Sequence, residues 1–154
     1  MKKVAVFPGS FDPITKGHEE IVRRASSMFD EIIVAIGNNT SKAAMFSVEQ
    51  RTKWVKSSFS DLANVSVESF EGLTVDFCKK NQVSIILRGV RSVVDFEYER
   101  AIAAMNKSIS HDIETVVLFS DSQWVSLSSS IIREIIKNKG DVSQFLPSGV
   151  DVYE

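Results

Sequence analysis

The sequence VAVFPGSFDPITKGH, residues 4–18, is the stretch that decides the fold of this chain. It begins with the short apolar run Val4–Phe7, passes through a glycine-containing loop, and reaches His18 where a helical pattern starts. Glycine lets the backbone approach a ligand closely, and a helix start offers free N–H groups to a phosphate. The Ser10 hydroxyl and the His18 imidazole could donate to the same anion. A tight strand-to-helix turn with a capping histidine is the alternative explanation of these residues.

The rest of the chain repeats this alternation of short apolar runs and helical patterns. The further runs lie at 32–36, 65–69, 83–87 and 115–119. Such near-continuous apolar runs are typical of parallel strands that are covered on both faces. Amphipathic stripes predict the helices between them; these stripes are Ile21/Val22/Ala25/Met28/Phe29, Val48/Thr52/Val55/Phe59, Tyr98/Ile102/Met105/Ile109 and Ile131/Ile132/Ile135/Ile136. We therefore predict one α/β domain over residues 1–154, a doubly wound parallel five-stranded sheet with helices on both faces.

Composition and charge narrow the functional classes. The 154 residues carry 18 Lys and Arg against 20 Asp and Glu, a net charge of −2, whereas nucleic-acid binders usually show a basic excess. No apolar run approaches the roughly 18 residues of a membrane span, and the run after Lys3 is too short for a signal peptide. Cys78 is the only cysteine, so no intrachain disulfide forms. We expect a cytoplasmic protein that binds neither nucleic acid nor a membrane.

Ligands of doubly wound folds bind beyond the carboxyl ends of the strands, so the loops there are the candidate site. Lys42 follows the second predicted strand, and Arg88 and Arg91 flank a glycine at the end of the fourth. Ser128–Ser130 begin the helix after the fifth strand, where hydroxyls and the helix dipole favour phosphate. Arginine adds planar, bidentate contacts to phosphate. Taken singly, these residues are also explained as a solvated lysine, a solvated turn and a helix cap.

Two strings in this order resemble a known family. Thr15-Lys16-Gly17-His18 resembles the T/H-x-G-H signature of the nucleotidylyltransferase superfamily, and the longer GSFDPITKGH is similar to its phosphopantetheine adenylyltransferase branch. Residues 127–133, LSSSIIR, resemble the second superfamily signature, I-S-S-T/S-x-x-R/K, with leucine in the first position. The resemblance covers nearly the whole chain, from Lys3 to Pro147, and implies a Rossmann-like nucleotidylyltransferase fold. The tail, residues 148–154, is shorter than in many relatives.

The resemblance also implies an activity: transfer of the adenylyl group of ATP to 4′-phosphopantetheine, which gives dephospho-coenzyme A and pyrophosphate. The implied catalytic residues are His18, Lys42, Ser10 and Arg91. The implied phosphopantetheine-binding residues are Ser10, Lys42, Thr74 and Arg88. The implied ATP-binding residues are Ser10, Phe11, His18, Gly89, Val90, Arg91, Glu99, Trp124, Val125, Ser126, Leu127, Ser128, Ser129 and Ser130. Two of these have plain structural alternatives, because Thr74 could be a helix N-cap and Glu99 could form a helix-surface ion pair.

The acceptor phosphate is already an anion, so we expect direct in-line attack on the α-phosphorus without a general base. The helix dipole should keep the His18 imidazole neutral. No protein metal site is visible, so Mg²⁺ should be held mainly by the substrate phosphates. A homohexamer and feedback binding of coenzyme A are further implications of the resemblance. A related adenylyl- or cytidylyltransferase with another acceptor, or a non-catalytic nucleotide-binding domain, are the alternatives; the residue 88–91 loop argues against the first, and intact Ser10, His18 and Lys42 against the second.

Overall fold

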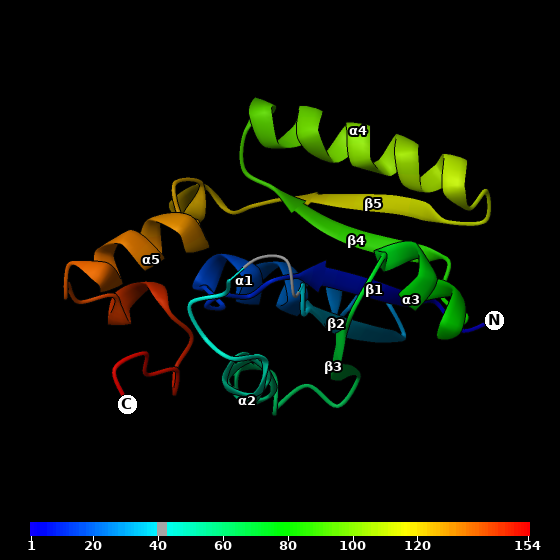
Figure 1. Ribbon diagram of the computed structural model, residues 1–154. Helices are drawn as coiled ribbons and strands as arrows, with labels where there is room; N and C mark the ends of the chain where they lie inside the picture. The colour runs from blue at the N-terminus through cyan, green and yellow to red at the C-terminus, as the bar shows by residue number, and fades with distance from the viewer. Residues whose placement is uncertain (40–42) are drawn as a thin grey trace.

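The protein is a parallel α/β sheet with helices on both faces (Figure 1). The computed structural model describes residues 1–39 and 43–154. Five parallel strands lie in the order β3-β2-β1-β4-β5; they are β1 Val4–Gly9, β2 Glu31–Gly37, β3 Val65–Phe70, β4 Ile85–Val90 and β5 Glu114–Phe119. The α-helices are α1 Lys16–Ala25, α2 Val48–Ser58, α3 Thr74–Lys80, α4 Val93–Ile109 and α5 Ser129–Lys137. The predicted fold class is confirmed.

Alternation along the central strands divides the core into two layers. Ala5 and Phe7 of β1 join the apolar cluster that α1, α2 and α5 also enter, whereas Val6 joins the cluster packed under α3. Successive side chains of a strand point to opposite faces, so a strand covered on both faces must be apolar throughout. This is why β1 and β2 lack the apolar–polar alternation of a sheet with one wet face.

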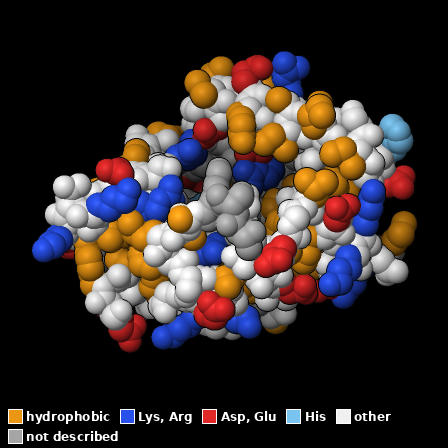
Figure 2. Space-filling view, in the orientation of Figure 1, with side chains coloured by type: hydrophobic (Ala, Val, Ile, Leu, Met, Phe, Trp, Pro, Cys, Tyr) orange, Lys and Arg blue, Asp and Glu red, His pale blue; other side chains and the backbone are white. Residues whose placement is uncertain are grey.

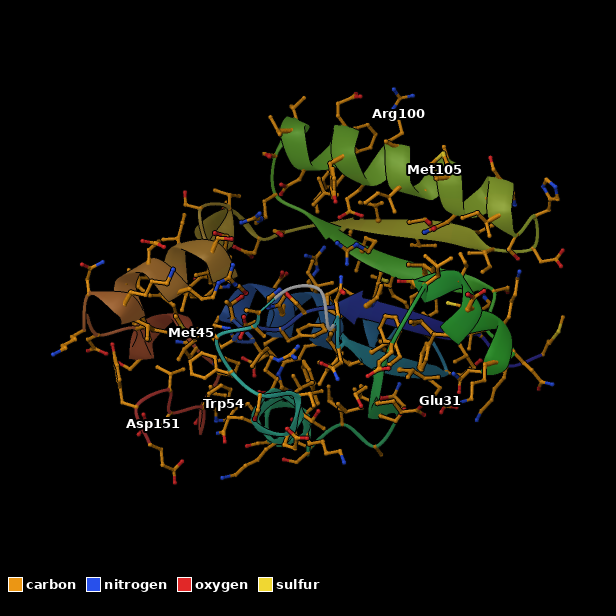
Figure 3. All side chains as sticks on the ribbon, in the orientation of Figure 1. Glu31, Met45, Trp54, Arg100, Met105 and Asp151 are labelled. Carbon is orange, nitrogen blue, oxygen red and sulfur yellow. The ribbon has the colours of Figure 1, made fainter. Side chains whose placement is uncertain are left out.

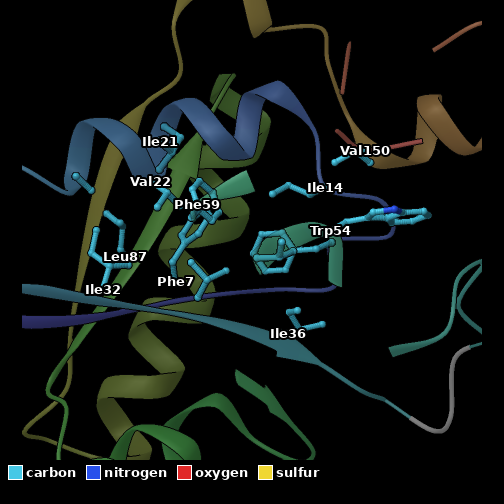
Figure 4. Close-up of a cluster of buried hydrophobic side chains, with 14 of the residues drawn as sticks. Phe7, Ile14, Ile21, Val22, Ile32, Ile36, Trp54, Phe59, Leu87 and Val150 are labelled. Carbon is cyan, nitrogen blue, oxygen red and sulfur yellow. The ribbon is translucent and has the colours of Figure 1, made fainter. Parts of the chain in front are cut away.

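The larger cluster binds the helices and the chain end to one face of the sheet. Figure 4 shows Val22 of α1, Phe59 at the end of α2 and Leu87 of β4 packed around Phe7. Val150, in the C-terminal tail, belongs to the same cluster. Full burial of a large apolar side chain stabilises the fold by roughly 1.5–3 kcal/mol. The short tail is therefore part of the core packing.

Several element boundaries differ from those predicted. The fourth strand runs from Ile85 to Val90 instead of beginning at Val83, so Arg88 and Gly89 lie within a strand and not in a loop. Helix α1 ends at Ala25, which leaves Met28 outside it and exposed. The extent of β4 has a non-local cause: the backbone of Arg88 and Gly89 pairs with β5, and this ladder extends the strand past the apolar run that marked it in the sequence.

Helix α4 is long but is only lightly packed on the sheet. Its one buried residue is Glu99, and the predicted apolar stripe of Tyr98, Ile102, Met105 and Ile109 is exposed. Figure 1 shows α4 running along β4 and β5, and Figure 3 shows Arg100 pointing away from the sheet. Periodicity predicts that this face of the helix is apolar, but it does not show whether residues of the same chain pack against it. Among the described residues, no helix is long and apolar enough to cross a membrane.

Candidate active site

Two cavities meet at the carboxyl ends of β1 and β4. The first, of about 370 Å³, lies beside the starts of α1 and α5 and is here called the central cavity. Its polar lining comprises Ser10, Thr15, His18, Arg88, Arg91, Asp95, Tyr98, Glu99, Ser120, Ser128, Ser129, Ser130 and Arg133. The second, of about 420 Å³, is the lateral cavity, and it extends beneath α4 past Phe70 and Thr74. The residues that line both cavities are Pro8, Gly9, Ser10, Arg88, Tyr98 and Glu99. Figure 2 shows basic side chains in the hollow beneath α4.

His18 is held at the third position of α1 by a reciprocal cap. Thr15 is the N-cap: its side chain accepts from the His18 backbone N–H, and its own N–H donates to His18 Nδ1 over 3.0 Å. A ring nitrogen that accepts a hydrogen bond carries no proton, so the proton of the neutral imidazole is on Nε2. The Phe11 ring packs edge-on against the imidazole, with centroids 5.0 Å apart. His18 therefore caps the helix and also directs an N–H donor from a fixed ring.

The environment of His18 keeps it neutral. Burial, as the largest cause, and the positive charges of Arg88 and Arg91 together lower its pKa from 6.5 to about 4. We expected a neutral imidazole from the helix dipole, and the neutral form agrees with that expectation. The causes differ, because desolvation and the two arginines produce the shift. At neutral pH the side chain is a hydrogen-bond donor that carries no charge.

Arg88 and Glu99 form an ion pair between β4 and α4. Arg88 Nε and Nη2 donate to the two carboxylate oxygens over 2.8 and 2.6 Å, and Nη1 donates to the Pro8 carbonyl. Glu99 is only 7% exposed and the Arg88 side chain is half-buried, so the pair is a bidentate contact between strand and helix and not the helix-surface pair offered as the plain alternative. These three bonds orient the guanidinium at the junction of the cavities. Because each Nη group retains a second hydrogen, the side chain still has N–H groups for a ligand.

The far wall of the central cavity is the start of α5. Ser128 is the N-cap and accepts from the Ile131 N–H, while Ser129 Oγ donates to the Pro13 carbonyl over 2.8 Å. Arg91 donates to the carbonyl of Leu127 over 2.7 Å and pairs with Asp95. These bonds join the two signature strings into one wall. The free N–H groups of a helix start and an adjacent arginine make this wall suited to an anion.

Some predicted site residues lie outside the cavity lining. Phe11 is 1% exposed, and its ring lies in the core against the His18 imidazole. Val90 is buried in β4, and Trp124–Ser126 lie between Ser120 and Leu127, both of which line the central cavity. Lys42 lies outside the described residues. Thr74, by contrast, lines the lateral cavity; it is not an N-cap, because the cap residue is Leu73 and Thr74 is the first residue of α3.

Sequence reasoning missed three charged residues around the site. Arg133 donates to the Asp12 carbonyl over 2.9 Å and to Ser130 Oγ. The sequence does signal Arg133, because this residue occupies the last position of the second signature string. Asp12 and Arg51 are both buried, and both bind backbone groups of the site loops. No local pattern marks a residue whose partners lie in distant loops.

Gly89 is required by close packing rather than by an unusual backbone angle. A Cβ atom at this position would lie 3.1 Å from Cγ1 of Ile21, on α1. Most Cβ contacts are longer, so the Ile21 side chain would have to shift by a few tenths of an ångström to admit one. Because α1 carries His18, this small residue brings the helix start close to the arginines on β4.

Comparison with known proteins agrees with this arrangement. The family model described as cytidylyltransferase-like matches residues 6–135. A phosphopantetheine adenylyltransferase of Flavobacterium psychrophilum is 50% identical over 96% of this chain and 97% of its own length, and one of Cytophaga hutchinsonii is 47% identical over 96% and 98%. The crystal structure of a putative nicotinate-nucleotide adenylyltransferase from Vibrio parahaemolyticus superimposes with a TM-score of 0.73 at 21% identity, covering 96% of this chain and 88% of that one. The latter shows the fold alone, whereas identity near one half over the full length shows the family: this chain belongs to the phosphopantetheine adenylyltransferase family.

Proposed function

We propose that this chain transfers the adenylyl group of ATP to the phosphate of 4′-phosphopantetheine, giving dephospho-coenzyme A and pyrophosphate, with ATP in the central cavity and the acceptor in the lateral one. The observation that carries the assignment of the cavities is their junction at Ser10, Arg88 and Glu99. An adenylyl transfer needs two polyanionic substrates whose phosphates meet at one point. Two adjoining cavities that share an arginine and a hydroxyl provide that point.

For ATP, we propose that the triphosphate lies between the start of α1 and the start of α5. His18 Nε2 is oriented for the α-phosphate, and Arg91 with Ser129 and Ser130 would bind the departing pyrophosphate. The support is geometric: all four residues line the central cavity, and two helix N-termini meet there. Gly89 would allow close backbone approach from β4.

For the acceptor, we propose that its phosphate binds Arg88 and that its pantetheine arm follows the lateral cavity. Phe70, Ile102 and Thr74 line that cavity beyond the junction, which suits an arm that is partly apolar and partly amide. Arg88 is held by Glu99 and Pro8, so it is already oriented before a phosphate arrives. Lys42, which lies outside the described residues, would add a further cation near the reacting phosphates.

The mechanism follows from charge. The acceptor phosphate oxygen attacks the α-phosphorus in line with the bond to the leaving pyrophosphate oxygen; one P–O bond forms, one breaks, and no proton has to be removed. Negative charge on the α-phosphate oxygens and the leaving group must be stabilised, and fixed donors do this without reorganisation. A neutral His18 donates through Nε2–H and does not act as a base. Holding two mutually repelling substrates in line is the other contribution of the site.

We propose Mg²⁺ as the cofactor, carried mainly by the substrate phosphates. The two carboxylates that line the central cavity, Asp95 and Glu99, are each engaged by an arginine, which fits an ion whose ligands are phosphate oxygens. When bound, the ion would neutralise part of the triphosphate charge. Within the described residues, no group of three or more His, Cys, Asp or Glu side chains could hold a metal.

We further propose a cytoplasmic homohexamer whose activity coenzyme A inhibits. Coenzyme A contains the same pantetheine arm as the acceptor, so the lateral cavity could bind both.

The exposed apolar side chains on α4 and β5, which include Met105, Ile109 and Phe119, fit a surface covered by other copies of the chain. Figure 2 shows hydrophobic side chains gathered over α4. The single buried thiol, Cys78, is compatible with a reducing compartment.

An acceptor panel tests the function. Purified protein with ATP and Mg²⁺ is given 4′-phosphopantetheine, nicotinate mononucleotide or nicotinamide mononucleotide, and pyrophosphate release is followed. We expect turnover with 4′-phosphopantetheine at a kcat/KM at least 10²-fold above the mononucleotides, because a site built around specific polar contacts rejects acceptors that lack them. Preference for a mononucleotide would assign the chain to another branch of the superfamily. Binding of ATP without turnover on any acceptor would indicate a nucleotide-binding domain.

A further inference from the structure

Arg51 is a buried arginine that binds three backbone carbonyls and lies outside the cavity lining. It is 3% exposed and comes from the first turn of α2. Nη1 donates to the Ser10 carbonyl over 2.7 Å and to the Gly37 carbonyl over 3.1 Å, and Nε donates to the Phe46 carbonyl over 3.1 Å. Among the described side chains, no carboxylate forms an ion pair with Arg51. Its positive charge therefore interacts with the dipoles of backbone carbonyls.

Two of these carbonyls, those of Ser10 and Gly37, lie just past the end of the β1–β2 ladder, although Gly37 still pairs with Phe70 of β3. The β1–β2 ladder ends at Gly9 and Ile36, after which the two chains turn toward different helices. Burying backbone carbonyls without hydrogen-bond partners is costly. The planar guanidinium satisfies three of them from one side chain. Arg51 thus joins the loop after β1, the end of β2 and the segment before α2.

The bond to Ser10 holds a peptide unit in an unfavourable conformation. Phe11, the next residue, has φ of +48°, which a non-glycine residue adopts at a cost of about 1–3 kcal/mol. This turn leaves the Ser10 side chain exposed at both cavities and sends the Phe11 ring beneath His18. The hydrogen bond to the Ser10 carbonyl therefore helps to fix the positions of Ser10 and His18, the two residues proposed to face the reacting phosphates.

A second buried charged residue, Asp12, also connects the loop after β1 to the segment before α2. The Asp12 carboxylate accepts from the backbone N–H groups of Met45 and Phe46, both over 2.9 Å. Figure 3 places Met45 on the segment that leads into α2. Arg51 and Asp12 thus bind the backbone of each other's segment, and Phe46 is held at both its N–H and its C=O.

We propose that Arg51 is a positioning residue for adenylyl transfer, which sets Ser10 and, through Phe11, His18 by holding the Ser10–Phe11 peptide in place. The inference rests on the proposed function for its rate readout. A displacement of about 1 Å in a reacting group can cost up to 10²-fold in rate. Loss of Arg51 should therefore lower kcat more than it weakens substrate binding, since the substrates contact other residues.

The test compares Arg51→Met and Arg51→Lys with a matched control, Arg23→Met. Arg23 also donates to a backbone carbonyl, that of Ser58 over 2.9 Å, but it does so at the far end of α1. We expect kcat to fall between tenfold and 10²-fold in Arg51→Met and less in Arg51→Lys, with ATP affinity within about threefold of wild type. All rates are measured well below each variant's Tm. Arg51→Lys keeps the charge and carries the test if Arg51→Met does not fold.

A readout without turnover separates this inference from the proposed function. NMR signals of the His18 imidazole, whose ring centroid lies 5.0 Å from that of Phe11, should shift in the Arg51 variants and not in Arg23→Met. Unchanged His18 signals together with kcat within twofold of wild type would make Arg51 purely structural. Equal losses of kcat in Arg51 and Arg23 variants would overturn the inference as well. Wild-type turnover in the same assay decides the proposed function independently.

Discussion

Replacing His18 with asparagine separates its two roles, because each ring nitrogen has a different task. Nδ1 accepts from the Thr15 N–H over 3.0 Å and completes the cap of α1, whereas Nε2–H is the proposed donor to the α-phosphate. In His18→Asn, the amide oxygen lies near the position of Nδ1 and can keep the cap, but nothing replaces Nε2. In His18→Gln, the longer side chain can place an amide N–H near the position of Nε2. The pair of variants therefore removes or restores the donor selectively.

The expected magnitudes differ for the two roles. Loss of one preorganised donor costs about 10²–10³ in kcat, or roughly 2.7–4 kcal/mol of transition-state stabilisation. Loss of a cap costs about 1 kcal/mol of stability. His18→Asn should thus lose at least 10²-fold in kcat with little change in stability. His18→Gln should regain part of the rate, and His18→Ala should lose both rate and about 1 kcal/mol of stability.

The assay is steady-state pyrophosphate release, with binding of both substrates measured by calorimetry and stability by urea unfolding. Charge grows on the phosphate oxygens mainly in the transition state, so kcat should fall while both dissociation constants stay nearly constant. A His18→Asn enzyme that keeps most of its kcat would show that the imidazole only caps α1. A parallel rise in the ATP dissociation constant would instead show ground-state binding, and the proposed role would be wrong.

Three further outcomes follow from the site. In the ligand-free protein, NMR should show His18 titrating near pH 4. Because this pKa is below the unfolded value of 6.5, unfolding takes up a proton between these values, and stability should fall as pH drops from about 6.5 to 4, more steeply in wild type than in His18→Asn. Arg88→Met should cost on the order of 3 kcal/mol in urea unfolding by leaving buried Glu99 unpaired, and adding Glu99→Gln should recover part of it; no recovery would mean that the pair is not coupled. Gly89→Ala should lower stability by about 1–3 kcal/mol through its contact with Ile21, and an unchanged Tm would show that α1 yields freely.

The fold was predictable because the decisive signals are local. Apolar runs such as Val4–Phe7 and Ile32–Ile36 lie in strands buried on both faces, and their alternation with helical patterns leaves few topologies. The extent of β4 was not predictable, because Arg88 and Gly89 enter the strand through pairing with β5. The exposed stripe of α4 was equally hidden, since periodicity shows that a face is apolar but not what covers it.

The site was predictable where a motif carries it and not where distant partners do. His18, Ser10 and Ser128–Ser130 are in signature strings, and the structure brings them to one cavity. Burial of the Arg88–Glu99 pair depends on how α4 packs, which no local pattern encodes. Arg51 was missed for the same reason, because its partners lie 41, 14 and 5 positions away in the chain.

The central claim is that the α-phosphorus of ATP moves to the acceptor. The most direct measurement follows ATP labelled with ³²P at the α- or the γ-position during turnover with 4′-phosphopantetheine and Mg²⁺, with the products separated by chromatography. We predict that the α-label appears in dephospho-coenzyme A and the γ-label in pyrophosphate, and that adding pyrophosphate returns the α-label to ATP. Transfer of the γ-label to the acceptor, or release of the α-label as free AMP, would contradict this account.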